Sequence, residues 1–331
     1  MVTTTITVNE RQCQKIGEIL GKLKFRHSFF ERPYITFSAE PEMKVRCYLL
    51  SLAICHQTHT LISRTKNLKG WEVLEDVFMR LTQENSDMIN MQALAAMSVT
   101  ELTERLRPLF ADDGDLKHCT LDRLEERSRF LIDIAEQLVK SYDGSLMKLV
   151  EQSDGFVTRL YALLDRFEAY KDPMRKKATC FIKFSVEAKL FTVKDPENIL
   201  PIMDYHMQRV LLRTGCVEIN DQDLKQKLQG RETLTSDEEI RQACVDATRL
   251  LAIYSGYPIA NMNDFLWPLG RSCCSENMLC QRGSCSKNPC TFNQAVDLAE
   301  HKQCIFAGTC KGSASEEYRK FWQPIVDTHY Y

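Results

Sequence analysis

The stretch GRSCCSENMLCQRGSCSKNPC, residues 270–290, contains five cysteines, and Cys304 and Cys310 follow it. Half of the chain's 14 cysteines therefore lie within residues 273–310. Thiolates so close along the chain can converge on one metal centre and close the fold around it. The predicted ligands are Cys274, Cys280, Cys285 and Cys290, spaced C-x5-C-x4-C-x4-C, with Cys273, Cys304 and Cys310 as alternates. The spacing alone leaves both zinc and an iron–sulfur cluster open.

The composition is that of an ordinary globular protein. The chain has 331 residues, of which 44% are hydrophobic and 27% charged, enough for a core of one or two subdomains. The formal net charge is −2, so a nucleic acid would have to bind a local basic patch. The N-terminus MVTTTITVNERQ lacks a signal-peptide pattern, and no stretch approaches the roughly 20 apolar residues of a membrane span.

These observations predict a cytoplasmic protein that does not bind membranes, nucleoid-associated if it is bacterial or archaeal. We also expect it to be a monomer. Fourteen cysteines in such a protein argue against a disulfide framework. The seven cysteines outside the C-terminal cluster are expected to be small buried hydrophobic residues.

Apolar residues recur at helical spacing along most of the chain, which predicts an all-α fold. Helices are expected over residues 45–63 and 70–81, after the capping box Ser98-x-x-Glu101, from Thr120 to Asp143-Gly144, after the cap Asp172-Pro173, from Asp204 to Gly215, after Ser236-x-x-Glu239, and over 263–271. Residues 220–235 are expected to be a polar connection. The N-terminal VTTTITV is expected to be either a short strand or a disordered lead.

The breaks between the predicted helices and the position of the cysteine cluster suggest three parts. Residues 1–44 are expected to form an N-terminal extension. Residues 45–272 are expected to form a helical domain of two subdomains, with the active site between them. Residues 273–331 are expected to form a cysteine-rich, metal-binding C-terminal region.

Four segments resemble the helix–hairpin–helix DNA glycosylases of the endonuclease III kind. Gly270-Arg271 precedes the cysteines as a Gly-Arg precedes the [4Fe–4S] loop of that superfamily, although its usual spacing is C-x6-C-x2-C-x5-C. IMDYHMQRVLLRTG (202–215) resembles VDxHVxRVxxRxG, LAICHQTHTL (52–61) resembles LxQQTxV, and KKATCFIK (176–183) resembles the segment after the hairpin. Together with GWEVL (70–74) and NDFLWPLGR (263–271), their separations are most similar to archaeal 8-oxoguanine DNA glycosylases.

The resemblance implies a set of site residues and a cofactor. Asp204 would be the catalytic carboxylate, and Lys176 or Lys177 the catalytic lysine. Gln57, Arg209 and Trp267 would contact DNA or stack on an extruded base. The cysteine loop would hold a structural [4Fe–4S] cluster, with zinc as the alternative.

The chemistry of these residues fits the cleavage of an N-glycosidic bond. That reaction builds positive charge on the sugar, which a carboxylate such as Asp204 can stabilise. A lysine of lowered pKa can form a Schiff base at C1′ and allow strand cleavage. The leading hypothesis is therefore a base-excision DNA glycosylase with AP-lyase activity, whose partner is DNA carrying a damaged or modified base.

One absence keeps two other hypotheses open. The hairpin signature LPGVGxK is missing, and KDPMRKK (171–177) stands in its place. In the superfamily, hairpin amides hold a DNA phosphate. The queuosine-salvage nucleotide glycosidases also have a helical, glycosylase-like body and a similar aspartate segment, but act on a small nucleotide. The third hypothesis is a non-catalytic nucleic-acid-binding protein.

Overall fold

The structure is a computed structural model that describes residues 5–112, 114–283, 285, 290–298 and 301–331. These residues are mostly helical, as predicted, and the strands among them are two or three residues long. None of the helices in this described part combines the length and apolar character needed to cross a membrane. The contacts divide the chain into two compact units, each treated separately below.

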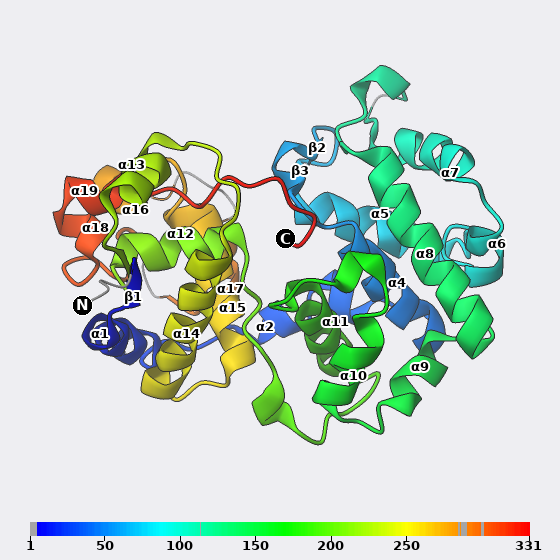
Figure 1. Cartoon of the computed structure of the whole chain (residues 1–331), viewed down its shortest axis with the longest axis horizontal. Coiled ribbons are helices and arrows are strands. Elements are labelled where there is room, and N and C mark those ends of the chain that lie inside the picture. The colour runs from blue at the N-terminus through cyan, green and yellow to red at the C-terminus, as the bar shows by residue number, and fades with distance from the viewer. Residues whose placement is uncertain (1–4, 113, 284, 286–289, 299–300) are drawn as a thin grey trace. The chain divides into compact units, whose positions relative to one another are not determined.

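Unit 2 contains residues 32–199 and the last four residues, 328–331. Its elements are α3 (Pro33–Thr36), α4 (Pro41–Ala53), η1 (Thr58–Thr60), β2 (Ile62–Ser63), β3 (Leu68–Lys69), α5 (Trp71–Gln83), α6 (Met91–Ala95), α7 (Val99–Leu106), η2 (Arg107–Phe110), η3 (Leu116–His118), α8 (Leu124–Tyr142), α9 (Leu146–Gln152), α10 (Val157–Leu164), η4 (Glu168–Tyr170), α11 (Lys176–Glu187) and η5 (Pro196–Asn198) (Figure 1).

The core of unit 2 surrounds α4. This helix packs against α5, α8, α9 and α11, and it is buried on nearly all sides. Apolar burial of this kind stabilises the fold by about 1.5–3 kcal/mol for each large side chain. Two buried tyrosine hydroxyls in this core are paired: Tyr48 donates to the carbonyl of Tyr34 at 2.9 Å, and Tyr170 donates to the carbonyl of Leu49 at 2.6 Å.

Unit 1 contains the described residues up to Glu31 and residues 200–327. Its elements are β1 (Ile6–Val8), α1 (Glu10–Leu20), α2 (His27–Phe30), α12 (Tyr205–Thr214), β4 (Val217–Ile219), α13 (Gln222–Gly230), α14 (Glu238–Ser255), α15 (Ile259–Pro268), the π-helical turn η6 (Leu269–Cys273), α16 (Leu279–Arg282), α17 (Thr291–Ala295), α18 (Lys311–Ala314) and α19 (Glu316–Arg319) (Figure 1).

The N-terminal segment packs against residues from the last third of the chain inside unit 1. Strand β1 pairs antiparallel with β4, with Ile6 opposite Ile219, so the N-terminal VTTTITV contains a short strand. Helix α1 then lies along α14 (Figure 1). The helices approach closely at Gly17, where a Cβ would lie 2.7 Å from the Cβ of Tyr254. Helix α12 packs against α14, α15 and η6, which places its N-terminal turn beside the turn that precedes the cysteines.

Several local predictions are confirmed because the residues that carry them make the expected backbone contacts. Ser98 accepts a hydrogen bond from the Glu101 N–H at 3.1 Å at the start of α7. Helix α5 covers the predicted 70–81 segment. Gly215 ends α12 in the left-handed conformation at φ 79°. Asp143 likewise ends α8 at φ 54°.

Two predicted helix boundaries are wrong because tertiary contacts override local preference. The helix expected over 45–63 ends at Ala53, since the Arg127 guanidinium binds the carbonyls of Ile54 and His56. The helix expected from Thr120 begins at Leu124. Thr120 instead donates its hydroxyl to the carbonyl of Ile62 at 3.0 Å, which holds this residue in the preceding loop.

Other boundaries also differ from expectation. The region 220–235 contains α13, capped by the Asp221 carboxylate, which accepts from the Leu224 N–H at 2.7 Å. Helix α11 begins at Lys176, yet the Asp172 carboxylate still accepts the Lys176 N–H at 2.9 Å. Ser236 likewise accepts from Glu238 N–H at 3.2 Å, although α14 starts after Asp237. The domain boundaries expected at 44 and 272 remain a prediction.

Gly270 provides a test of the packing between η6 and α12. A Cβ at this position would lie 2.7 Å from the backbone oxygen of His206, which cannot move without displacing α12. We expect Gly270→Ala to lower the free energy of unfolding by about 1–3 kcal/mol, measured by urea denaturation. Gly230→Ala is the control, since its nearest neighbour would be a flexible side chain at 3.4 Å. Equal effects of the two substitutions would contradict this packing.

Candidate active site and metal-binding group

Asp204 is the N-cap of α12. It has extended backbone angles, φ −113° and ψ 177°, and its Oδ1 accepts from the Met207 N–H at 2.9 Å. Only 6% of the residue is exposed. The positive end of the helix dipole favours a carboxylate at this place. Asp204 is thus a buried, oriented carboxylate in unit 1.

Two aromatic rings follow Asp204 in the chain, and a third packs against them. Tyr205 and His206, the next two residues, have ring centroids 4.3 Å apart. Trp267 of α15 approaches His206 edge to face at 6.2 Å, and the guanidinium of Arg271 lies 5.1 Å from the Trp267 ring centre. Tyr205, His206 and Trp267 are all partly exposed. They could stack against a planar base that reaches the start of α12.

Arg209, about one turn further along α12, makes structural hydrogen bonds. Its guanidinium donates to the carbonyls of Gly270 at 2.8 Å and Cys274 at 2.9 Å, and lies 3.0 Å from Nδ1 of His206. Burial lowers the pKa of Arg209 to about 10. Arg209 therefore ties α12 to the turn before the cysteines, in place of the DNA contact that the resemblance implied.

The other predicted site residues lie in unit 2. Gln57 has a left-handed backbone at φ 46°, and its N–H donates to the carbonyl of Tyr331 at 3.1 Å. Lys176 is half-buried, and its Nζ lies 3.2 Å from Sγ of Cys55. Lys177 is fully buried and donates to the carbonyl of Ala53 at 2.6 Å. The structure thus brings these three residues into the same unit.

The structure contains a buried cluster around His56 that the sequence did not predict. Arg127 is fully buried, and its Nη1 lies 3.4 Å from Nδ1 of His56. Because arginine only donates, Nδ1 accepts, and Nε2 carries the proton toward Glu126 at 3.0 Å. Burial, followed by Lys177 and Arg127, holds the pKa of His56 far below its ordinary value, so this histidine is neutral.

The sequence did contain one signal for this cluster. Arg127 stands three residues after Leu124 and four before Leu131, on the apolar stripe predicted for the helix. A charged residue in such a position must be buried and paired. The C-terminal residues gave no comparable signal, although the His329 ring lies 5.0 Å from that of Phe130.

Four ligand-type side chains converge in the C-terminal part of unit 1. The ligand atoms of Cys273, Cys285, Cys290 and His301 all lie within 4.8 Å of one another. Sγ of Cys273 is 3.2 Å from Nε2 of His301 and 4.0 Å from Sγ of Cys290. Three thiols and one imidazole form a set that structural metal sites use. This group could hold a metal ion.

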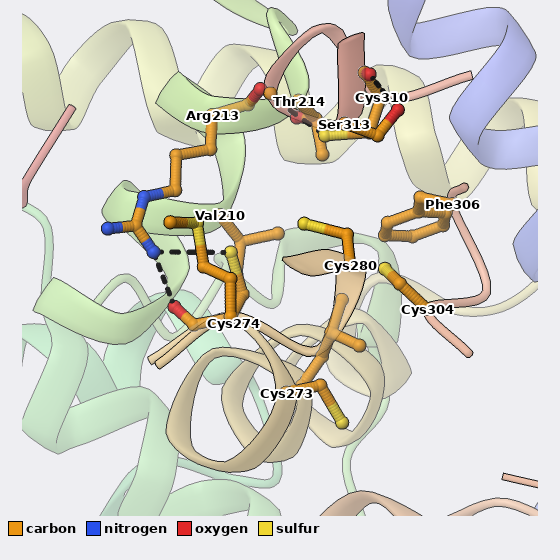
Figure 2. A pocket seen from close by; sticks show the side chains of 13 residues that line it. Val210, Arg213, Thr214, Cys273, Cys274, Cys280, Cys304, Phe306, Cys310 and Ser313 are labelled. Carbon is orange, nitrogen blue, oxygen red and sulfur yellow. Dashed lines mark hydrogen bonds between the residues drawn. The ribbon is translucent and has the colours of Figure 1, made fainter. Parts of the chain in front are cut away.

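The predicted ligand quartet is divided between two places. Cys285 and Cys290 belong to the group above, joined by the alternate Cys273 and by His301. Cys274 and Cys280 instead line a neighbouring cavity with the alternates Cys304 and Cys310, and Cys273 also contributes to its lining (Figure 2). His301 was missed, although the pattern His301-x-x-Cys304 has the short spacing of metal ligands.

The buried Lys177 makes stability depend on pH. Burial lowers its pKa to about 7, with Lys176 and Arg127 acting in the same direction, whereas the pKa of an unfolded lysine is about 10.4. Between these values the unfolded chain binds more protons, so this residue makes the free energy of unfolding rise with pH. The penalty from burying it is largest below pH 7.

We therefore predict a pH-dependent difference between the wild type and Lys177→Met. Their difference in free energy of unfolding should shift in favour of the wild type from pH 7 to pH 10, by at most about 1.4 kcal/mol per pH unit. Urea denaturation under reducing conditions at several pH values measures it. A difference that stays constant with pH would show that Lys177 keeps its proton in the folded chain.

Comparison with known proteins identifies relatives of this chain. A family model described as "Queuosine salvage protein" matches residues 53–252. A curated relative from Mus musculus, "Queuosine 5'-phosphate N-glycosylase/hydrolase", is 24% identical over 159 residues. That alignment covers 44% of this chain and 46% of the relative, so the chain spans about half the length of the relative it matches. Asp204, Gln57 and Lys177 lie within the family match, whereas the cysteine cluster follows it.

These matches correct the leading sequence-based hypothesis. The matched family is a queuosine salvage family, so membership of the helix–hairpin–helix DNA glycosylases is wrong. The predicted base-excision repair function with AP-lyase activity and the predicted partner, damaged DNA, are wrong for the same reason. The comparisons favour the alternative of a nucleotide N-glycosidase. With the match extending over residues 53–252 of 331, the chain belongs to the queuosine salvage protein family.

Proposed function

We propose that this protein is an N-glycosidase that hydrolyses queuosine 5'-phosphate or a closely similar modified nucleotide. The observation that carries the proposal is a buried, helix-capping carboxylate, Asp204, inside the segment matched by the family. The mouse relative's description supplies the substrate class and the reaction. The substrate is thus a free nucleotide, which agrees with the absence of the LPGVGxK hairpin signature from the sequence.

The reaction breaks the bond between C1′ of the ribose and a nitrogen of the base. The bonding electrons leave with the base, which takes up a proton, and water adds to C1′ to give the free sugar phosphate. Positive charge develops on the sugar ring as the bond lengthens. A carboxylate beneath the ring stabilises that charge and can orient or deprotonate the attacking water.

Asp204 is suited to this role by its surroundings. Its Oδ1 is fixed by the Met207 N–H, so the carboxylate has a defined direction at the end of a rigid helix. Burial to 6% exposure lowers the local dielectric and strengthens its interaction with a developing cation. An N-cap contact and a catalytic role use the same carboxylate and do not compete.

The proposal assigns a role to the aromatic rings of unit 1 and none to a lysine nucleophile. Tyr205, His206 and Trp267 offer partly exposed faces for stacking on the base. Hydrolysis by water needs no Schiff base, so Lys176 and Lys177 are not nucleophiles in this reaction. Lys177 instead ties α11 to the end of α4 through the carbonyl of Ala53.

The group of Cys273, Cys285, Cys290 and His301 is proposed to hold structural zinc. Cys3His is among the ligand sets of closed zinc sites, whereas a [4Fe–4S] cluster is usually held by four cysteines. The group follows the segment matched by the family, so the ion would stabilise the C-terminal part of unit 1 and would take no part in bond cleavage.

Asp204→Asn tests the catalytic assignment. We expect base release from queuosine 5'-phosphate to fall by about 10²–10⁴-fold, because the amide cannot stabilise the cationic sugar or accept a proton. Asparagine caps helices as well as aspartate does, so the free energy of unfolding should change little. Release of the free base is followed by liquid chromatography.

The control is Asp221→Asn, which alters the exposed N-cap of α13 in the same unit and should leave activity unchanged. Full activity of Asp204→Asn would remove Asp204 from the mechanism. Base release from damaged DNA, with none from the nucleotide, would overturn the proposed substrate class.

Trp267→Ala tests the stacking surface. Stacking of a base on an aromatic side chain contributes about 1–3 kcal/mol, so kcat/KM should fall by roughly 5- to 150-fold, mainly through a higher KM. Trp267→Phe keeps an aromatic face and should retain most of the affinity. A loss of kcat at unchanged KM in Trp267→Ala would contradict a role in base binding.

A further inference from the structure

Of the seven cysteines in residues 273–310, four lie outside the Cys3His group, and these four line one cavity. Cys274, Cys280, Cys304 and Cys310 line a space of about 20 Å³ beside the last turn of α12. Figure 2 shows their sulfur atoms placed around this space. They come from the end of η6, from α16 and from the segment before α18, so three separate pieces of the chain supply them.

The adjacent residues Cys273 and Cys274 belong to different sets of ligands. Cys273 is the last residue of the π-helical turn η6 and Cys274 is its C-cap, so the two neighbouring side chains leave the backbone in different directions. In Figure 2 the Cys273 thiol points away from the cavity, while that of Cys274 points into it. Cys273 instead meets His301 and Cys290 in the Cys3His group.

We propose that Cys274, Cys280, Cys304 and Cys310 bind a second metal ion, a thiophilic divalent cation of the Zn²⁺ type. The chain would then contain two four-ligand sites whose ligands are interleaved along the sequence. The first uses residues 273, 285, 290 and 301, and the second uses 274, 280, 304 and 310. Together the two sites account for every cysteine from 273 to 310.

Arg213 provides the outer contacts that such a site needs. It is 3% exposed, and its Nη1 lies 3.6 Å from Sγ of Cys274 and donates to the carbonyls of Cys274 and Ser275, both at 2.9 Å. Sγ of Cys310 lies 3.4 Å from the Arg213 carbonyl oxygen. Four thiolates around a divalent ion carry two excess negative charges, which a buried guanidinium partly offsets.

Four thiols around one cavity are a ligand set that a single tetrahedral Zn²⁺ ion uses. Four cysteines also hold iron–sulfur clusters, so the test below distinguishes the two. A single ion would fasten residues 304–310 to the last turn of α12, the helix that begins at Asp204.

The experiment counts metal ions in the purified full chain by elemental analysis and native mass spectrometry. The wild type should contain two zinc ions per chain. Cys280→Ser and Cys304→Ser should each retain one ion, and so should Cys285→Ser of the Cys3His group. Cys119→Ser, which removes a cysteine of unit 2 outside both sets, should retain two.

A second measurement uses the wild type alone, in case a serine variant does not fold. Alkylation with a maleimide, mapped by mass spectrometry, should modify Cys274, Cys280, Cys304 and Cys310 only as a chelator removes the second ion. One ion per chain in the wild type, with these four thiols reactive before chelation, would overturn the proposal. Iron with inorganic sulfide in place of two zinc ions would also overturn it. Neither readout depends on glycosidase activity.

Discussion

Two buried guanidinium groups on α12 hold the functional part of unit 1 together. Arg209 and Arg213 point toward the C-terminal segment and donate to the backbone carbonyls of Gly270, Cys274, Ser275 and Phe321. A buried guanidinium must have its donors paired, because each unpaired polar group would cost about 1–3 kcal/mol. The chain after α15 therefore has to pass close to α12, and this brings the cysteines to the end of the helix that starts at Asp204.

The same constraint shapes the interior of unit 2. The Arg127 guanidinium donates to the backbone carbonyls of Ile54 and His56, where α4 has ended. The next residue, Gln57, has a left-handed backbone. Helix α11 adds a second buried cation, Lys177, to the carbonyl of Ala53. Cations from two helices thus replace the helical hydrogen bonds that α4 would otherwise make at its C-terminal end. In unit 2 the segment before Gln57 contacts the buried Arg127, and in unit 1 the segment after Asp204 contacts the buried Arg209.

Under the proposed function, the resemblance to DNA glycosylases has a physical reason. DNA glycosylases and the relative described as an N-glycosylase/hydrolase both break an N-glycosidic bond, for which a carboxylate at the start of a helix is useful. The sequence then indicates the segment around Asp204 but not the partner. Under the proposed function, the choice between DNA and a free nucleotide depends on the surface beside Asp204, where His206 meets Trp267 from much later in the chain.

Local spacing was enough to predict the helical character of the chain, the cap at Ser98, the end of α12 at Gly215, the position of Asp204 at a helix start, and a metal-type cysteine cluster. These patterns are visible within short stretches of sequence. Other features became apparent from the folded chain: where α4 ends, that Arg209 binds backbone carbonyls, and that the Cys273 and Cys274 thiols face different groups. A thiol or a guanidinium can pair with partners far along the chain, and spacing does not rank those partners.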